Sequence, residues 1–141
     1  MLEDGDDVKL GGGILVVHRT SGPTRGCTTW TWNLKDDRKT YDVIVIDSPN
    51  FDPGYRLLDS QDDPEIADDF ARTFKVLKAL PCDVFLGAHG RCCGMAARYE
   101  SIKKTCKANP FGGPEGYRAF VAQTEEAFFA TLTAQRARQS R

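Results

Sequence analysis

The sequence has little net charge and no long apolar run, and each of these absences excludes a class of function. A net charge of −1 leaves no basic surface for a phosphate backbone, so nucleic acid is not an expected partner. No apolar run approaches the roughly 20 residues of a membrane-spanning helix, so we expect no membrane partner. The beginning, MLEDGDDVKL, is acidic and polar and does not resemble a secretory signal. A strand pattern follows it at once, so Met1 is not expected to be the natural start of the protein.

The remaining composition is typical of one folded domain. The 141 residues, 40% hydrophobic and 28% charged, can bury a core, and we expect a single partial domain over residues 1–141. The five cysteines are an odd number and cannot all pair within one chain. We find no internal repeat and no low-complexity linker.

Apolar periodicity predicts strands first and helices later. Alternating or β-branched runs predict strands at 6–10, 14–18, 28–32, 41–46 and 84–86. Spacing of three to four residues predicts helices at 64–80, 94–104 and 114–138. A charged segment, 35–39, is expected to be a solvated hairpin turn. The fold class is therefore α/β (α+β by content), with helices on one face of a sheet.

Residues 80–94 contain His89, a candidate metal ligand. Residues 80–94 read LPCDVFLGAHGRCCG, in which a buried strand ends in small residues around His89. A neutral imidazole at the exposed end of a strand is a common metal ligand. The alternative is a loop histidine without a partner, and this stretch alone does not decide between them.

Three ordered stretches together carry a family resemblance. The first comprises 11–12, 17–18 and GPTRGCTTWTW at 22–32; the second comprises IDS at 46–48 and PGY at 53–55; the third comprises 80–90, NPF at 109–111 and GY at 116–117. In this order and spacing the chain resembles the C-terminal half of the third subclass of class B metallo-β-lactamases. The resemblance implies half of an αββα sandwich with a mainly antiparallel, mixed sheet. It also implies zinc as cofactor, two ions in relatives, for the hydrolysis of β-lactams by periplasmic or secreted enzymes.

The zinc ligands of that family are mostly missing here. The family's HxHxDH motif is absent, since the chain has two histidines, His18 and His89. At the position of the family's GHTxG motif the chain reads GPTRG, so Pro23, which has no donor atom for zinc, replaces a ligand. His18 falls on the strand before that loop, at a position that is not a ligand in the family. His89 alone matches a ligand position, and because a catalytic zinc usually needs three protein ligands, we expect no stable zinc binding by this chain.

The resemblance assigns roles to four further residues. Ser48 and Asn50 match positions that border the second zinc and the substrate groove, although the neighbouring Asp47 and Ser48 also suit a turn that caps backbone amides. Cys82 and Cys106 match a disulfide in relatives. Two free thiols are the alternative in a reducing compartment.

Cys92 and Cys93 depart from the family and form a His-x-x-Cys-Cys cluster with His89. Thiolate and imidazole suit zinc or copper(I), and a thiolate beside a charged histidine can act as a nucleophile. Because no second ligand pair follows at a standard spacing, we favour adventitious binding over a dedicated site.

Two functions follow. The first is a truncated or degenerate metallo-β-lactamase-like protein that is inactive as an isolated chain. The alternative is a non-catalytic association module, whose uncovered sheet face, expected to include Val16, Trp30, Trp32 and Ile44, packs on a second copy or on a complementing N-terminal half. An active enzyme assembled with such a half would still lack the ligand replaced by Pro23.

Overall fold

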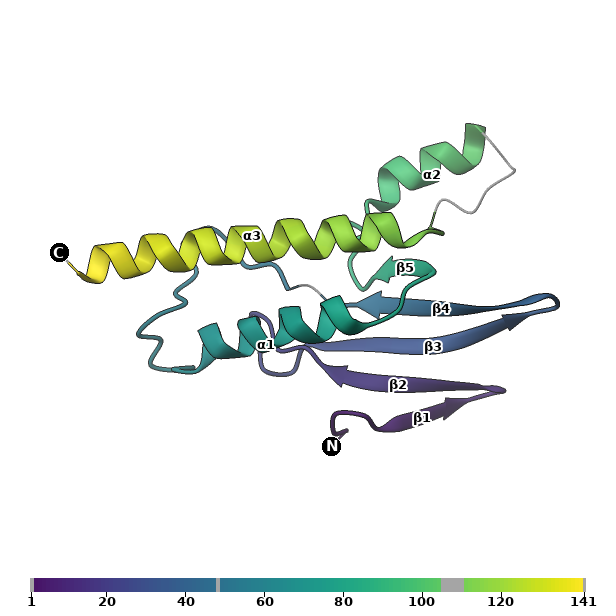
Figure 1. The fold of residues 1–141 in the computed structure, drawn as a ribbon, viewed down its shortest axis with the longest axis horizontal. Coiled ribbons are helices and arrows are strands. Elements are labelled where there is room, and N and C mark those ends of the chain that lie inside the picture. The colour runs from purple at the N-terminus through teal and green to yellow at the C-terminus, as the bar shows by residue number, and fades with distance from the viewer. Residues whose placement is uncertain (1, 48, 105–110, 141) are drawn as a thin grey trace.

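The fold is one sheet with helices against one of its faces. The computed structural model describes residues 2–47, 49–104 and 111–140. Five strands form the sheet, and the two longer helices, α1 and α3, lie together on the same side of it (Figure 1). Within these residues, no helix is both long and apolar enough to cross a bilayer.

The strands are arranged across the sheet in chain order. Consecutive antiparallel pairing joins the first four, which are β1 (Asp7–Leu10), β2 (Gly13–Arg19), β3 (Thr28–Asp36) and β4 (Lys39–Ile46). The last, β5 (Val84–Gly87), is parallel to β4. A parallel neighbour needs a crossover connection, which α1 provides. The predicted mixed, mainly antiparallel sheet is thus confirmed.

Helices α1 (Ile66–Ala79) and α3 (Pro114–Gln139) supply most of the core. The apolar residues that give the predicted helix at 64–80 its spacing of three to four are all buried in α1; they are Ile66, Phe70, Phe74 and Leu77. The ring of Phe128 from α3 lies 5.4 Å from that of Phe70 and 5.6 Å from that of Phe74, measured between centroids. The shorter helix α2 (Met95–Lys104) extends away from this body, beyond the beginning of α3 (Figure 1).

The register of the strands separates two faces of the sheet. Ile44 lies opposite Thr31 on β3 and Phe85 on β5, and its side chain belongs to the helix-covered core. Side chains alternate along a strand, so Val43, with its cross-strand partners Trp32 and Val84, lies on the second face. We call this second face the tryptophan face; it comprises Leu15, Val17, Trp30, Trp32, Val43, Val45, Val84 and Leu86.

The predicted composition of the uncovered face is half wrong. Trp30 and Trp32 are on the tryptophan face, whereas Val16 and Ile44 are in a row that faces the helices. Trp30 lies opposite Val17 rather than Val16. Because side chains alternate with a period of two, an error of one residue in register moves a residue to the other face.

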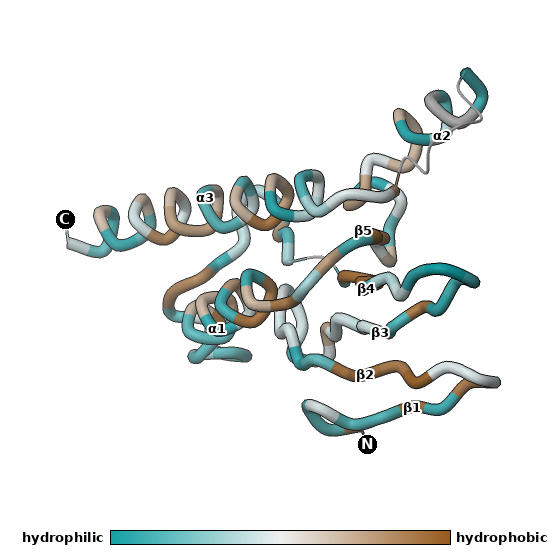
Figure 2. Tube along the Cα trace, turned by 45° about the vertical axis from the view of Figure 1, so that its right-hand side comes forward, coloured by the Kyte–Doolittle hydropathy of each residue, from teal (hydrophilic) through white to brown (hydrophobic). Residues whose placement is uncertain are grey.

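Most predicted boundaries agree with the structure within two residues, and the largest difference is at the β3–β4 hairpin. The charged segment predicted as a turn is mostly part of the ladder, with Lys35 opposite Thr40 and Asp36 opposite Lys39. This end of the hairpin is exposed. Its teal colour in Figure 2 shows that it is also hydrophilic. Charged side chains are tolerated there because both faces of the ribbon meet water, so composition alone did not indicate a strand.

Candidate functional site

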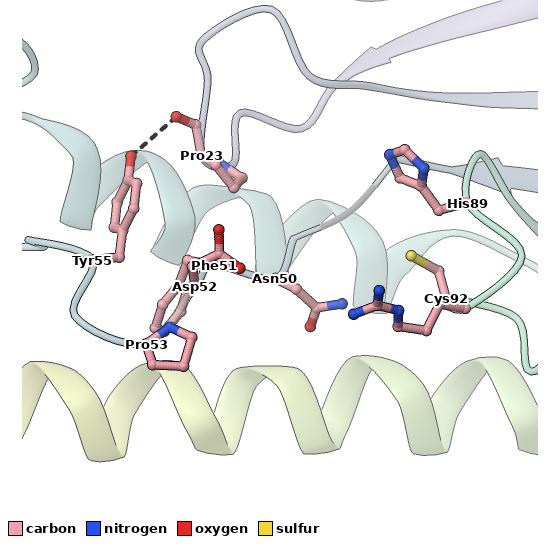
Figure 3. Close-up of a pocket in the computed structure, with 9 residues that line it drawn as sticks. Pro23, Asn50, Phe51, Asp52, Pro53, Tyr55, His89 and Cys92 are labelled. Carbon is pink, nitrogen blue, oxygen red and sulfur yellow. Dashed lines mark hydrogen bonds between the residues drawn. The ribbon is translucent and has the colours of Figure 1, made fainter.

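Three connecting segments line an open cavity of about 830 Å³ at the end of the sheet near α1 (Figure 3). One segment connects β2 with β3, the second connects β4 with α1, and the third is the turn after β5. The lining residues are Pro23, Asn50, Phe51, Asp52, Pro53, Tyr55, His89, Arg91 and Cys92. Residues far apart in the sequence thus meet in one cavity.

The segment that contains Pro23 is held by hydrogen bonds to the other elements. The hydroxyl of Tyr55 donates to the carbonyl of Pro23 at 3.0 Å (Figure 3). The hydroxyl of Thr73 in α1 donates to the carbonyl of Ser21 at 2.7 Å. These bonds involve backbone carbonyls, so they fix the loop without a metal ion.

An ion pair adds to this attachment. The guanidinium of Arg25 donates twice to the carboxylate of Asp63, at 3.0 and 2.6 Å. This hydrogen-bonded partner holds the pKa of Asp63 below its ordinary value. The pair joins the β2–β3 loop to the segment before α1.

His89 reaches the cavity from a tight turn. Strand β5 ends at Gly87, and the backbone N–H of Cys92 donates to the carbonyl of His89 at 2.9 Å. A Cβ atom at Gly87 would lie 2.8 Å from the Cβ of Cys92, so the absence of a side chain there lets the turn fold back onto the strand. His89 is exposed and Cys92 is buried.

The structure brings together three of the positions that the sequence resemblance singled out. His89, Asn50 and Pro23, the last being the replaced ligand, line the same cavity. His18 does not: its Nε2 lies 2.7 Å from the hydroxyl of Thr31 on the neighbouring strand. Ser48 lies outside the described residues.

Cys92, considered from the sequence as a metal ligand, also lines the cavity, and the remaining lining residues were not predicted as site residues. Phe51 and Tyr55 pack against each other and against Phe70, with ring centroids 5.5 to 6.4 Å apart. Asp52 and Arg91 are exposed charges that no local pattern distinguishes from ordinary surface. For Pro53 and Tyr55 the sequence did contain a clue to a place in the site, because the Pro53-Gly54-Tyr55 turn belongs to the second stretch of the resemblance.

The predicted disulfide is not formed at Cys82, which is a free thiol in the structure. Its predicted partner Cys106 lies outside the described residues. Cys82 lines a different cavity, between the end of α1 and the beginning of α3. Burial, with smaller contributions from Asp83 and Asp42, raises the pKa of its thiol to about 11.

The donor set does not fit a zinc centre. In residues 2–47, 49–104 and 111–140, no group of three or more histidine, cysteine, aspartate or glutamate side chains could hold a metal ion. The two histidines of the chain are in different environments, and His89 alone lines the cavity. A catalytic zinc commonly has three protein ligands, and Asp52, His89 and Cys92, although they all line the cavity, do not form such a group.

The fold is similar to those of solved metallo-β-lactamases. The FEZ-1 metallo-β-lactamase from Legionella gormanii is 41% identical over 96% of this chain and 51% of that chain, with a TM-score of 0.89. BJP-1, a subclass B3 metallo-β-lactamase of Bradyrhizobium japonicum, is 31% identical over 98% of this chain and 52% of that chain, with a TM-score of 0.83. LRA-12, a class B3 di-zinc metallo-β-lactamase from an Alaskan soil metagenome, is 22% identical over 92% and 49%, with a TM-score of 0.81.

These similarities concern part of each solved protein. The chain spans about half the length of the metallo-β-lactamases it matches, and its mixed sheet with helices matches half of their α/β fold. No protein-family model matches the chain.

Proposed function

We propose that this chain is a degenerate metallo-β-lactamase-like protein that carries one part of a β-lactam cavity and does not hydrolyse β-lactams on its own. The observation that supports this is the meeting of Pro23, Asn50 and His89 in one cavity. By resemblance, two of these positions hold zinc ligands and one borders the substrate. The cavity is present, and Pro23 occupies one of the two positions that hold zinc ligands in the family.

The chemistry of the family explains why such a cavity would be inactive. Zinc lowers the pKa of bound water enough to supply a hydroxide near neutral pH, and it polarises the carbonyl that is attacked. His89, even together with Cys92 from the same turn, leaves at least one of the three usual protein ligands to be supplied from elsewhere. Asn50 lines the cavity beside His89, where an amide side chain suits a binding role and not a catalytic one.

Turnover of a chromogenic cephalosporin tests the proposal. The purified chain is expected to give no hydrolysis above the buffer rate, with zinc added or with a chelator added. Hydrolysis that a chelator abolishes and added zinc restores would contradict the proposal. A full-length metallo-β-lactamase, assayed in the same buffer, is the positive control.

A second candidate function is association through the tryptophan face. This face carries eight apolar side chains in contiguous rows, and none of the described helices lies against it (Figure 1). Six of these side chains are half-buried, whereas Val17 and Val43 are almost fully buried. An apolar patch of this kind is typical of an interface. We propose a second copy of this chain as the occupant, since two such sheets can pack face to face. A complementing half of a metallo-β-lactamase, which would add about as much chain again, is the competing outcome.

A further inference from the structure

We propose that His89 and Cys92 form a two-ligand site for a soft monovalent cation of the copper(I) class. Both residues line the cavity described above, and they are the first and fourth residues of one tight turn. Figure 3 shows the imidazole and the thiol extending from this turn in the same direction. This site requires neither zinc nor a β-lactam, so it is independent of the proposed function.

The backbone of the turn brings the two residues together. The N–H of Cys92 is bonded to the carbonyl of His89, and the Cβ of Cys92 packs against Gly87 at the end of β5. Strand β5 is itself fixed by four paired residues on β4. A ligand pair on a turn that is anchored to a sheet loses little conformational freedom when it binds an ion.

Cys92 is distinguished from the other described cysteines by this placement. Cys93 packs into the helix-covered core, and its thiol donates to the carbonyl of Gly90 at 3.6 Å. The thiol of Cys27 lies 3.2 Å from the hydroxyl of Thr24, and neither it nor Cys82 lines this cavity. The His-x-x-Cys-Cys sequence thus contributes one cysteine to the cavity rather than two.

The chemistry of these donors suits copper(I). Thiolate sulfur is a soft ligand that selects copper(I), and imidazole binds copper well. A soft d¹⁰ cation such as copper(I) can be held by two donors in a linear arrangement, so the lack of a larger ligand group among the described residues does not exclude it. On binding, the Cys92 thiol releases its proton to solvent, the sulfur and an imidazole nitrogen bond to the metal, and no electron is transferred.

The charges around the pair also permit this site. The two charged residues that line the cavity, Asp52 and Arg91, have opposite signs. A copper(I) ion and one thiolate form a neutral unit, so binding adds no net charge to the cavity.

Competition with a chromophoric copper(I) chelator, under anaerobic conditions, tests the site. We expect one copper(I) ion per chain, and we expect Cys92→Ser and His89→Asn each to weaken binding by at least about tenfold. Cys82→Ser is the matched control and should bind as the wild type does. The proposal is overturned if Cys92→Ser binds copper(I) unchanged, or if Cys82→Ser alone removes the binding.

Protection from alkylation gives a second measurement that needs no variant. The native chain is treated with iodoacetamide with and without copper(I), and the modified cysteines are located by mass spectrometry. Cys92 should be protected by one equivalent of copper(I), while Cys82 should react equally in both samples. The incubation is extended until Cys92 is modified in the sample without copper(I), and the same extent of Cys92 modification with copper(I) present would refute the site.

Discussion

His18 is half-buried and hydrogen-bonded within the sheet, whereas His89 is exposed at the cavity, and this difference determines what each imidazole can bind. His18 lies within the sheet, hydrogen-bonded to Thr31 through its Nε2, while His89 is exposed at the cavity. Partial burial lowers the pKa of His18 below 6.5, and nearby Asp4 offsets part of this effect. His18 is therefore part of the fold, and His89 is available to a ligand.

The lowered pKa of His18 predicts a pH-dependent stability. Above about pH 6.5, His18 is neutral in both the folded and the unfolded chain. As the pH falls below that value, the unfolded chain takes up the proton first, so the free energy of unfolding decreases until the folded-state pKa is passed. Urea titrations between pH 7.5 and pH 5 measure this loss.

The variant His18→Gln separates this effect from other titrations. Glutamine keeps a hydrogen-bonding group near Thr31 and removes the titration, so the variant should lose less stability over the same pH range. An equal loss in the variant and the wild type would assign the effect to other groups.

At the scale of elements, the packing of α1 against α3 carries the core. Phe128 is fully buried between Phe70 and Phe74, and its neighbour Phe129 is 49% exposed. Phe128→Ala should lower the free energy of unfolding by about 3–5 kcal/mol, because it removes a buried ring and leaves a cavity.

Phe129→Ala is the control on the same helix. Its ring contacts that of Phe128 at its edge, so we expect a loss of about 1 kcal/mol or less. Urea denaturation of both variants measures the difference. Similar losses would mean that α3 is not oriented as described.

The individual helices and strands were easier to predict from the sequence than the register in which the strands pair. The spacing of Ile66, Phe70 and Phe74 predicted α1, because an amphipathic helix needs one apolar stripe. The face of Val16 could not be read from composition, since it depends on a register that is set by pairing with β3.

The cavity was predictable in part. His89 and Asn50 were identified through the family resemblance, whereas Asp52 and Arg91 were not. Asp52 and Arg91 line the cavity because the fold brings segments together that are far apart in the sequence. Proximity of this kind leaves no periodic pattern in the sequence. Likewise, only the fold separates Cys92 from Cys93, which are adjacent in the chain but differ in surroundings.

At the scale of the whole molecule, the tryptophan face predicts self-association. Light scattering coupled to size exclusion should give twice the mass of 15.6 kDa for the purified chain. Trp32→Lys should shift this equilibrium toward the monomer, because a lysine in the middle of an apolar interface leaves a charge unpaired.

Ile14→Lys is the matched control for that experiment. Ile14 is 48% exposed and belongs to the same alternating row as Val16, so it is not on the tryptophan face. It should leave the mass unchanged. A wild-type monomer at all concentrations would argue against the second copy and favour a complementing half as the occupant.

Zinc binding measured by equilibrium dialysis tests the central claim most directly. The wild-type chain should hold well under one ion at micromolar zinc, since His89 has no imidazole partner in the cavity. Pro23→His should raise the affinity by about tenfold or more, and Pro53→His, which alters another cavity residue, should not. Two tightly bound zinc ions in the wild-type chain would contradict the account.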